Sequence, residues 1–221
     1  MISIKAPSPI PALFIGAEMD GLGGGTGWHW GDDILVDNST GELDLDTGFS
    51  AASKLLGPIL KVVLGRENGT GEGKGLGFAP RDVFLWGFGQ GGMVALSLAE
   101  AFGVELAGVI SIGGKIASSK SAMPQAVDGL PESVVGKKEA GGKSKTPILL
   151  CGGHRHTAVT ANVLRDVKER FGSVTYVKWE REGDAMARNR GEMLPIMKFL
   201  ASRLRMPTPV GMEEAGGVSR T

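Results

Sequence analysis

Short apolar runs alternate with longer segments of helical periodicity through most of the chain. The predicted strands are residues 82–86, 109–112, 147–151 and 174–179. The predicted helices are residues 49–64, 93–102, 158–171 and 192–204, with Thr47 or Ser50 as the cap of the first. Parallel strands need crossover helices, which cover both faces of the sheet. The sequence therefore predicts an α/β fold, a three-layer sandwich with a mostly parallel sheet.

The remaining segments have little periodicity. Residues 2–4 read as a short strand that ends at a proline cluster, while residues 17–47 and 115–146 read as long loops. The 36 glycines among 221 residues are about twice the usual share, which fits long connections. Length alone favours one domain. We expect a single domain over residues 1–206 and a disordered tail over 207–221.

Charge and composition exclude several classes of partner. The 24 basic and 24 acidic residues cancel, which argues against nucleic acid or an anionic membrane surface as the partner. No apolar run approaches the ~20 residues of a membrane span, and the first residues do not resemble a secretory signal. The single cysteine, Cys151, excludes an intrachain disulfide and fits a reducing compartment. We expect a cytoplasmic protein.

A glycine-rich turn follows the predicted strand at 82–86. Gly87, Gly89 and Gly92 satisfy the spacing G-x-G-x-x-G between a strand and a helix, as in dinucleotide-binding proteins. That fingerprint also needs a carboxylate about 20 residues later for the ribose hydroxyls. The next strand ends in Gly-Gly-Lys at 113–115 without one, so dinucleotide binding stays an alternative.

The same turn fits a nucleophile elbow, in which a strained strand-to-helix turn lifts a serine above the sheet. Residues 84–96 read Phe-Leu-Trp-Gly-Phe-Gly-Gln-Gly-Gly-Met-Val-Ala-Leu. This segment resembles the phospholipase/carboxylesterase family of α/β hydrolases, which includes the acyl-protein thioesterases. The elbow of that family reads Gly-Phe-Ser-Gln-Gly-Gly. The resemblance extends to residues 28–33, 108–114, 147–160 and 183–204. The sequence of these segments is similar to a filamentous-fungal branch of the family.

The resemblance implies a Ser-Asp-His triad in that chain order, and all three positions are substituted here. Gly89 stands at the serine, His156 at the aspartate and Met186 at the histidine. Glycine offers no nucleophile, methionine takes no proton at neutral pH, and histidine cannot orient an imidazole as a carboxylate does. The backbone N–H of Gln90 could still serve as one oxyanion donor.

The family's second oxyanion donor lies on a loop after an earlier strand, which the resemblance places beside the elbow strand. Residues 21–25 resemble that loop only in composition. We therefore expect a sheet that is reduced at its N-terminal edge. Residues 2–4 could pair directly with residues 82–86, residues 12–15 could fill the gap, a partner subunit could do so, or further residues precede Met1.

Other candidate ligands have simpler structural explanations. Cys151, His154 and His156 form C-x-x-H-x-H, but zinc needs a fourth ligand or an open position. We expect a core cysteine followed by two loop histidines, and no metal or cofactor. His29 is expected to be a packed loop residue rather than a base, and Asp32 and Asp33 to act in a turn or helix cap rather than hold a cation.

The predicted function is that of a pseudo-hydrolase, inactive or weak, that binds an acyl or ester-like ligand or a protein. One alternative is an active carboxylic-ester or thioester hydrolase with a non-standard site. The other is a dinucleotide-binding protein that uses residues 87–92. The sequence does not decide whether the chain forms an oligomer.

Overall fold

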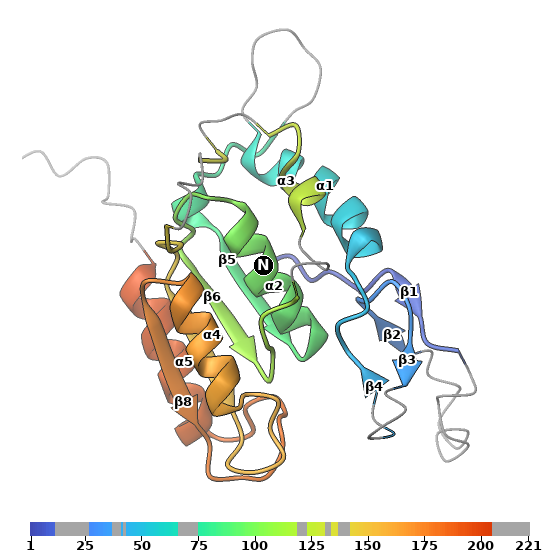
Figure 1. Cartoon of the computed structure of the whole chain (residues 1–221). Coiled ribbons are helices and arrows are strands. Elements are labelled where there is room, and N and C mark those ends of the chain that lie inside the picture. Colours follow the sequence, from blue (N-terminus) through green and yellow to red (C-terminus); the bar gives the residue numbers. More distant parts are fainter. Residues whose placement is uncertain are drawn as a thin grey trace, which may run out of the picture.

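The computed structural model describes residues 1–11, 27–36, 41, 43–65, 75–118, 123–130, 134–136 and 142–204 (Figure 1). Its helices are α1 (Ser50–Leu64), α2 (Gln90–Ala101), α3 (Pro124–Val127), α4 (Ala161–Arg170) and α5 (Arg190–Arg203), with a 3-10 turn at Pro80–Asp82. The main sheet contains β5 (Phe84–Phe88), β6 (Gly108–Ile112), β7 (Ile148–Gly152) and β8 (Val174–Lys178). Two short antiparallel pairs precede it: β1 (Ser8–Pro9) with β2 (Trp28–His29), and β3 (Leu35–Val36) with β4 (Leu43–Asp44).

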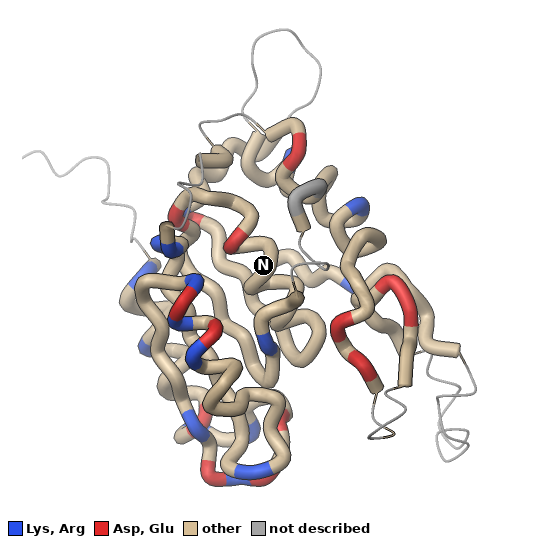
Figure 2. The backbone as a smooth tube through the Cα atoms, viewed as in Figure 1, with Lys and Arg blue, Asp and Glu red and all other residues tan. Residues whose placement is uncertain are grey.

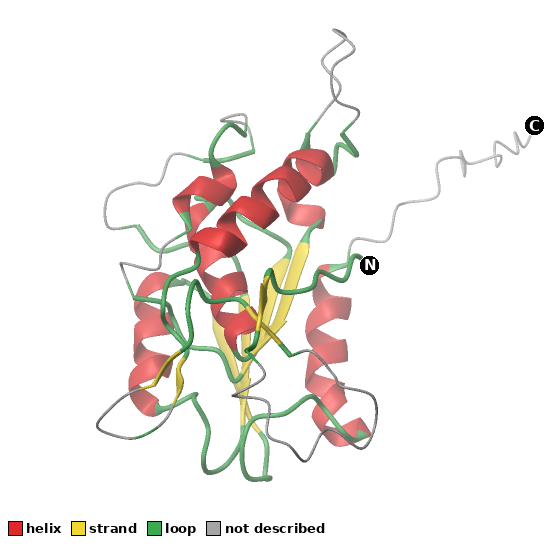
Figure 3. Ribbon diagram, turned by 90° about the vertical axis from the view of Figure 1, so that its right-hand side faces the viewer, coloured by secondary structure: helices red, strands yellow, loops and turns green. Residues whose placement is uncertain are grey.

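The main sheet is parallel throughout, in the order β5-β6-β7-β8. Helix α5 covers one face, and α1 to α4 lie on the other side (Figures 1 and 3). Every residue of the central strands β6 and β7 is buried, as expected for strands covered on both faces. The predicted α/β sandwich is confirmed, and each predicted strand and helix of its core is present within a few residues.

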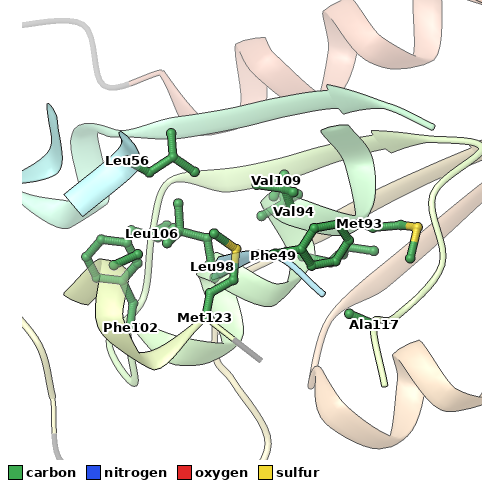
Figure 4. Packing of buried hydrophobic residues seen from close by; sticks show 14 of the residues in the cluster. Phe49, Leu56, Met93, Val94, Leu98, Phe102, Leu106, Val109, Ala117 and Met123 are labelled. Atoms are coloured by element: carbon green, nitrogen blue, oxygen red, sulfur yellow. The ribbon is translucent and has the colours of Figure 1, made fainter. Parts of the chain in front are cut away.

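Two apolar clusters form the core, one on each face of the sheet. The larger joins α1, α2 and the other helices of that side. Figure 4 shows Phe49 and Met123, which directly precede α1 and α3, packed among side chains of α2. The smaller cluster lies under α5 and contains Ile110, Ile112 and Cys151. Because the strands between these clusters are parallel, their carboxyl ends lie at the same edge of the sheet.

Helix α1 begins at Ser50, but the predicted caps do not hold it. The carboxylate of Asp32 accepts hydrogen bonds from the N–H groups of Ser50 (2.9 Å) and Ala51 (2.8 Å) and from the Ser50 hydroxyl (2.8 Å). Thr47 instead donates its hydroxyl to the carbonyl of Asp33. A side chain 18 residues upstream therefore satisfies the first N–H groups of the helix, and the capping role expected of Asp32 is confirmed.

The N-terminal segment differs from the prediction. Residues 2–4 form no strand; the first strand is β1, which pairs with β2 and not with β5. The prediction that residues 2–4 pair directly with β5, the strand that leads into the elbow, is therefore wrong. A run of three residues forms a strand only where a neighbouring strand accepts and donates its backbone hydrogen bonds. Residues 12–15 lie outside the described part. Among the described residues, β5 pairs with β6 alone.

Both predicted loops contain regular structure. The segment 17–47 includes β2, β3 and β4, and the segment 115–146 includes α3. Basic and acidic residues interleave along α4, α5 and the loops that flank them (Figure 2). None of the described helices is long and apolar enough to cross a membrane. The predicted tail, residues 207–221, and the single-domain boundary are not tested, since residues 205–221 lie outside the described part.

Candidate functional site

The turn between β5 and α2 is the centre of the candidate site. Gly89, its apex, has φ 51° and ψ −122°, a backbone conformation that is strained for residues with a side chain. Its N–H donates to the carbonyl of Ile112 on β6 (2.8 Å), and its own carbonyl accepts from Gly92 (3.0 Å) and Met93 (3.1 Å). The backbone therefore turns sharply from strand into helix at the carboxyl edge of the sheet, which is the geometry of a nucleophile elbow.

The glycines around the apex are required by close packing. A Cβ on Gly87 would overlap the carbonyl group of Gly91, and a Cβ on Gly92 would lie 2.5 Å from the Ser111 hydroxyl. Gly89 is different, because a Cβ there would meet no described atom within 4 Å. The apex thus has open space for a side chain but carries none.

The segment before α1 braces this turn. The N–H of Trp30 donates to Gln90 Oε1 (3.0 Å), and Gln90 Nε2 donates to the carbonyl of Leu45 (3.1 Å). The backbone N–H of Gln90 is the first of α2, where no intrahelical acceptor exists, so it can serve as one anion or carbonyl donor. Residues 21–25, which were compared with the second donor loop, lie outside the described part.

Asp184, on the loop after β8, is a site residue that the sequence did not indicate. Its carboxylate accepts hydrogen bonds from Gly153 N (3.0 Å), Thr157 Oγ1 (2.7 Å) and Ala158 N (2.7 Å). It also lies against the carboxyl end of β6, where a Cβ on Gly113 would be 2.6 Å from Asp184 Cβ. Asp184 therefore links the loop after β7 to the carboxyl end of β6, the strand whose Ile112 carbonyl accepts a hydrogen bond from Gly89.

The two other positions that the resemblance matches to the triad are exposed. His156 is exposed and is the one non-glycine residue with positive φ (51°) among the described residues. Met186 is 47% exposed. The match of Met186 rests on aligning Gly183 and the Glu-Met pair at 192–193 without gaps, whereas the structure brings Asp184, two residues earlier, next to β6. That spacing carries no signal for Asp184.

The C-x-x-H-x-H residues are not brought together as a metal site. Cys151 is fully buried, and burial raises the pKa of its thiol to about 12, which disfavours the thiolate form near neutral pH. His154 and His156 are exposed, and no group of three potential ligands occurs within the described residues. His29 lies on β2, with a buried Nδ1 that has no described hydrogen-bond partner.

Fold and turn together define an α/β-hydrolase architecture. Residues 16–178 match the family Phospholipase/Carboxylesterase, and the chain belongs to this family. An uncharacterized hydrolase of Schizosaccharomyces pombe is 28% identical over 120 residues, which are 52% of this chain and 41% of that protein. The matched part thus spans less than half of the relative's length.

Solved structures agree on the fold. Two variants of SOBER1 from Arabidopsis thaliana are similar, with TM-scores of 0.50 and 0.51 and identities of 21% and 19%. Each match covers 82% of this chain and 77% of the other. At these identities the similarity concerns the arrangement of strands and helices alone.

Proposed function

We propose that this chain is a non-catalytic, cytoplasmic member of the phospholipase/carboxylesterase family that binds an acyl or ester-like ligand at the β5–α2 turn. The observation that carries the proposal is Gly89. It keeps the elbow conformation, with open space at its Cα, and has no side chain that could attack an acyl carbon.

The neighbouring groups support a loss of catalysis. An elbow serine needs a base within hydrogen-bond reach and a carboxylate that orients the base. Asp184 lies against the carboxyl end of β6, and it already accepts three hydrogen bonds from the loop after β7. His154 and His156, the imidazoles of that loop, are both exposed. Among the described residues, these groups therefore do not favour acid and base catalysis at Gly89.

The features that remain are suited to binding. The N-terminus of α2 carries a partial positive charge, and the Gln90 N–H is available to a carbonyl or carboxylate oxygen. Phe88, directly before the apex, is 47% exposed and can contact an acyl chain. A protein that presents an acylated or acidic residue would use the same contacts.

Turnover of p-nitrophenyl butyrate and of an acyl thioester tests the catalytic half of the proposal. We expect no turnover by the wild-type chain and none by Gly89→Ser alone. Wild-type turnover that survives repeated purification would contradict the proposal and favour an active hydrolase with a non-standard site.

Ligand binding is tested by thermal shift with octanoate. We expect stabilisation of the wild type that is lost in Gly89→Leu, whose side chain would fill the open space at the apex. NAD and NADP form the comparison arm. Stabilisation by a dinucleotide and not by octanoate would favour the alternative use of residues 87–92.

A further inference from the structure

The side chain of Gln90 joins two parts of the chain that no strand pairing among the described residues joins. Strand β2 ends at His29 and β4 ends at Asp44, and each belongs to a separate two-stranded sheet. The residue after each strand bonds to Gln90: its Oε1 accepts from the N–H of Trp30 (3.0 Å), and its Nε2 donates to the carbonyl of Leu45 (3.1 Å). An amide side chain can do both because it carries an acceptor and donors. The ends of the two small sheets therefore meet at the first residue of α2.

Close packing holds this bridge in place. A Cβ on Gly31 would lie 2.5 Å from Thr47 Oγ1 and 3.2 Å from Gln90 Nε2. The segment after β2 approaches the amide so closely because residue 31 has no side chain. The next residue, Asp32, accepts the hydrogen bonds that cap α1. The bridge is thus continuous with the contacts that hold the first helix.

The bridge also determines where the indole of Trp30 lies. Trp30 is partly buried and packs against the larger core cluster. The edge of its ring reaches the first turn of α2, with Nε1 3.4 Å from the point that a Cβ on Gly91 would occupy. Gly91 directly follows Gln90, whose backbone N–H is the donor of the proposed ligand site. Within the part of the chain that the structure describes, no hydrogen bond uses Trp30 Nε1.

We propose that Gln90 is a positioning residue whose side chain holds the indole N–H of Trp30 beside the elbow, as a second donor to the acyl oxygen of the ligand. A carbonyl or carboxylate oxygen has two lone pairs and can accept from both donors. The inference rests on the proposed function and specifies its ligand, which must present such an oxygen. The second donor expected on residues 21–25 lies outside the described part, whereas Trp30 is a side-chain donor from another segment.

Isothermal titration calorimetry of the full chain with octanoate tests the role of the amide. Gln90→Met keeps the length of the side chain and the backbone N–H, but it removes both hydrogen bonds of the bridge. We expect octanoate to bind about tenfold more weakly, the effect of losing about one hydrogen bond. Thr47→Val is the matched control, because it removes two hydrogen bonds with Asp33 in the same segment and should leave the affinity unchanged. An unchanged affinity in Gln90→Met would overturn the proposal.

A double-mutant cycle separates positioning from a general loss of stability. Trp30→Phe keeps an aromatic ring and removes the indole N–H, so it should weaken octanoate binding by a similar factor. If Gln90 acts through Trp30, the double variant Gln90→Met/Trp30→Phe binds no more weakly than Trp30→Phe alone. Additive losses in the double variant would overturn the proposal. Circular dichroism shows that each variant is folded.

The indole N–H resonance of Trp30, assigned by its loss in Trp30→Phe, reports on the donor directly. In heteronuclear NMR spectra this resonance should shift when octanoate saturates the wild type, and it should shift less in Gln90→Met. Octylamine has the same chain but no acceptor oxygen and should cause no shift. Octanoate binding without a shift of this resonance would overturn the second donor and leave the proposed function standing. A wild type that does not bind octanoate would overturn both.

Discussion

The β5–α2 turn and the loops after β7 and β8 lie at one edge of the sheet, yet different kinds of contact hold them. The turn is held by backbone contacts, between Gly87 and Gly91 and between Gly89 and Ile112. Backbone hydrogen bonds of 2.7 Å also join the two loops. In addition, the carboxylate of Asp184 accepts hydrogen bonds from three groups of the loop after β7. The turn thus depends on close approach of backbone to backbone, whereas the loops depend on one carboxylate as well.

The largest effect is expected from a methyl group inside the turn. Gly87→Ala places a Cβ against the carbonyl of Gly91, where only backbone can move. We expect a loss of at least about 3 kcal/mol in the free energy of unfolding, measured by urea denaturation. Gly89→Ala is the control: its Cβ meets open space, so only the positive φ costs about 1–2 kcal/mol. Equal losses in both variants would show that backbone contacts do not hold the turn.

The second largest loss of stability is expected from removal of the Asp184 carboxylate, which clamps the loop after β7 through three hydrogen bonds. Asp184→Ala leaves the N–H of buried Gly153, the Thr157 hydroxyl and the Ala158 N–H without their acceptor. We expect a loss of about 2–3 kcal/mol in the free energy of unfolding and faster hydrogen exchange at Gly153 and Ala158. Glu182→Ala, at an exposed position on the same loop, should change neither. Unchanged exchange in Asp184→Ala would contradict a clamp.

Asp32 lies in the segment that precedes α1 and braces the turn. We expect it to contribute about 1 kcal/mol to the free energy of unfolding, and this contribution should depend on pH. Burial acts to raise the pKa of Asp32, but hydrogen bonds from Ala51 and Ser50 outweigh it and hold the pKa below its ordinary value of 3.8. A lowered pKa contributes stability above pH 3.8 that is lost as pH falls through the folded-state value.

The difference in melting temperature between wild type and Asp32→Ala should therefore be full at pH 6 and shrink below pH 3.8. Asp33→Ala, whose carboxylate does not reach α1, serves as the control. A difference that stays constant into acid would mean that the charge of Asp32 does not stabilise the helix.

The smallest effect is expected at the apex of the loop after β7. His156 has φ 51°, which strains a residue with a Cβ but not glycine. His156→Gly should raise the free energy of unfolding by up to about 1 kcal/mol, partly offset by the greater freedom of glycine when unfolded. His154→Gly, which has no positive φ to relieve, should destabilise. A clear loss of stability in His156→Gly would indicate that its imidazole makes a contact beyond those described.

Local patterns were sufficient to predict the core of the fold. The predicted strands 109–112 and 147–151 became β6 and β7 within one residue, because a short run covered on both faces must be apolar throughout. The helical spacing of Leu56, Leu60 and Val63 predicted α1 for a similar reason. The glycines at 87–92 predicted a strand-to-helix turn, since only a residue without Cβ fits so close a backbone.

Only the tertiary structure decided how distant side chains are used. The cap of α1 comes from Asp32, and the clamp of the loop after β7 comes from Asp184, 26 to 31 residues away in sequence. Residues 2–4 have strand-like composition but form none, because a strand needs a partner that the pattern does not name. Trp86 and Phe88 are apolar residues of a sheet strand, yet they are 42% and 47% exposed. Sequence periodicity reports which face of an element is apolar, whereas packing decides whether another element reaches that face.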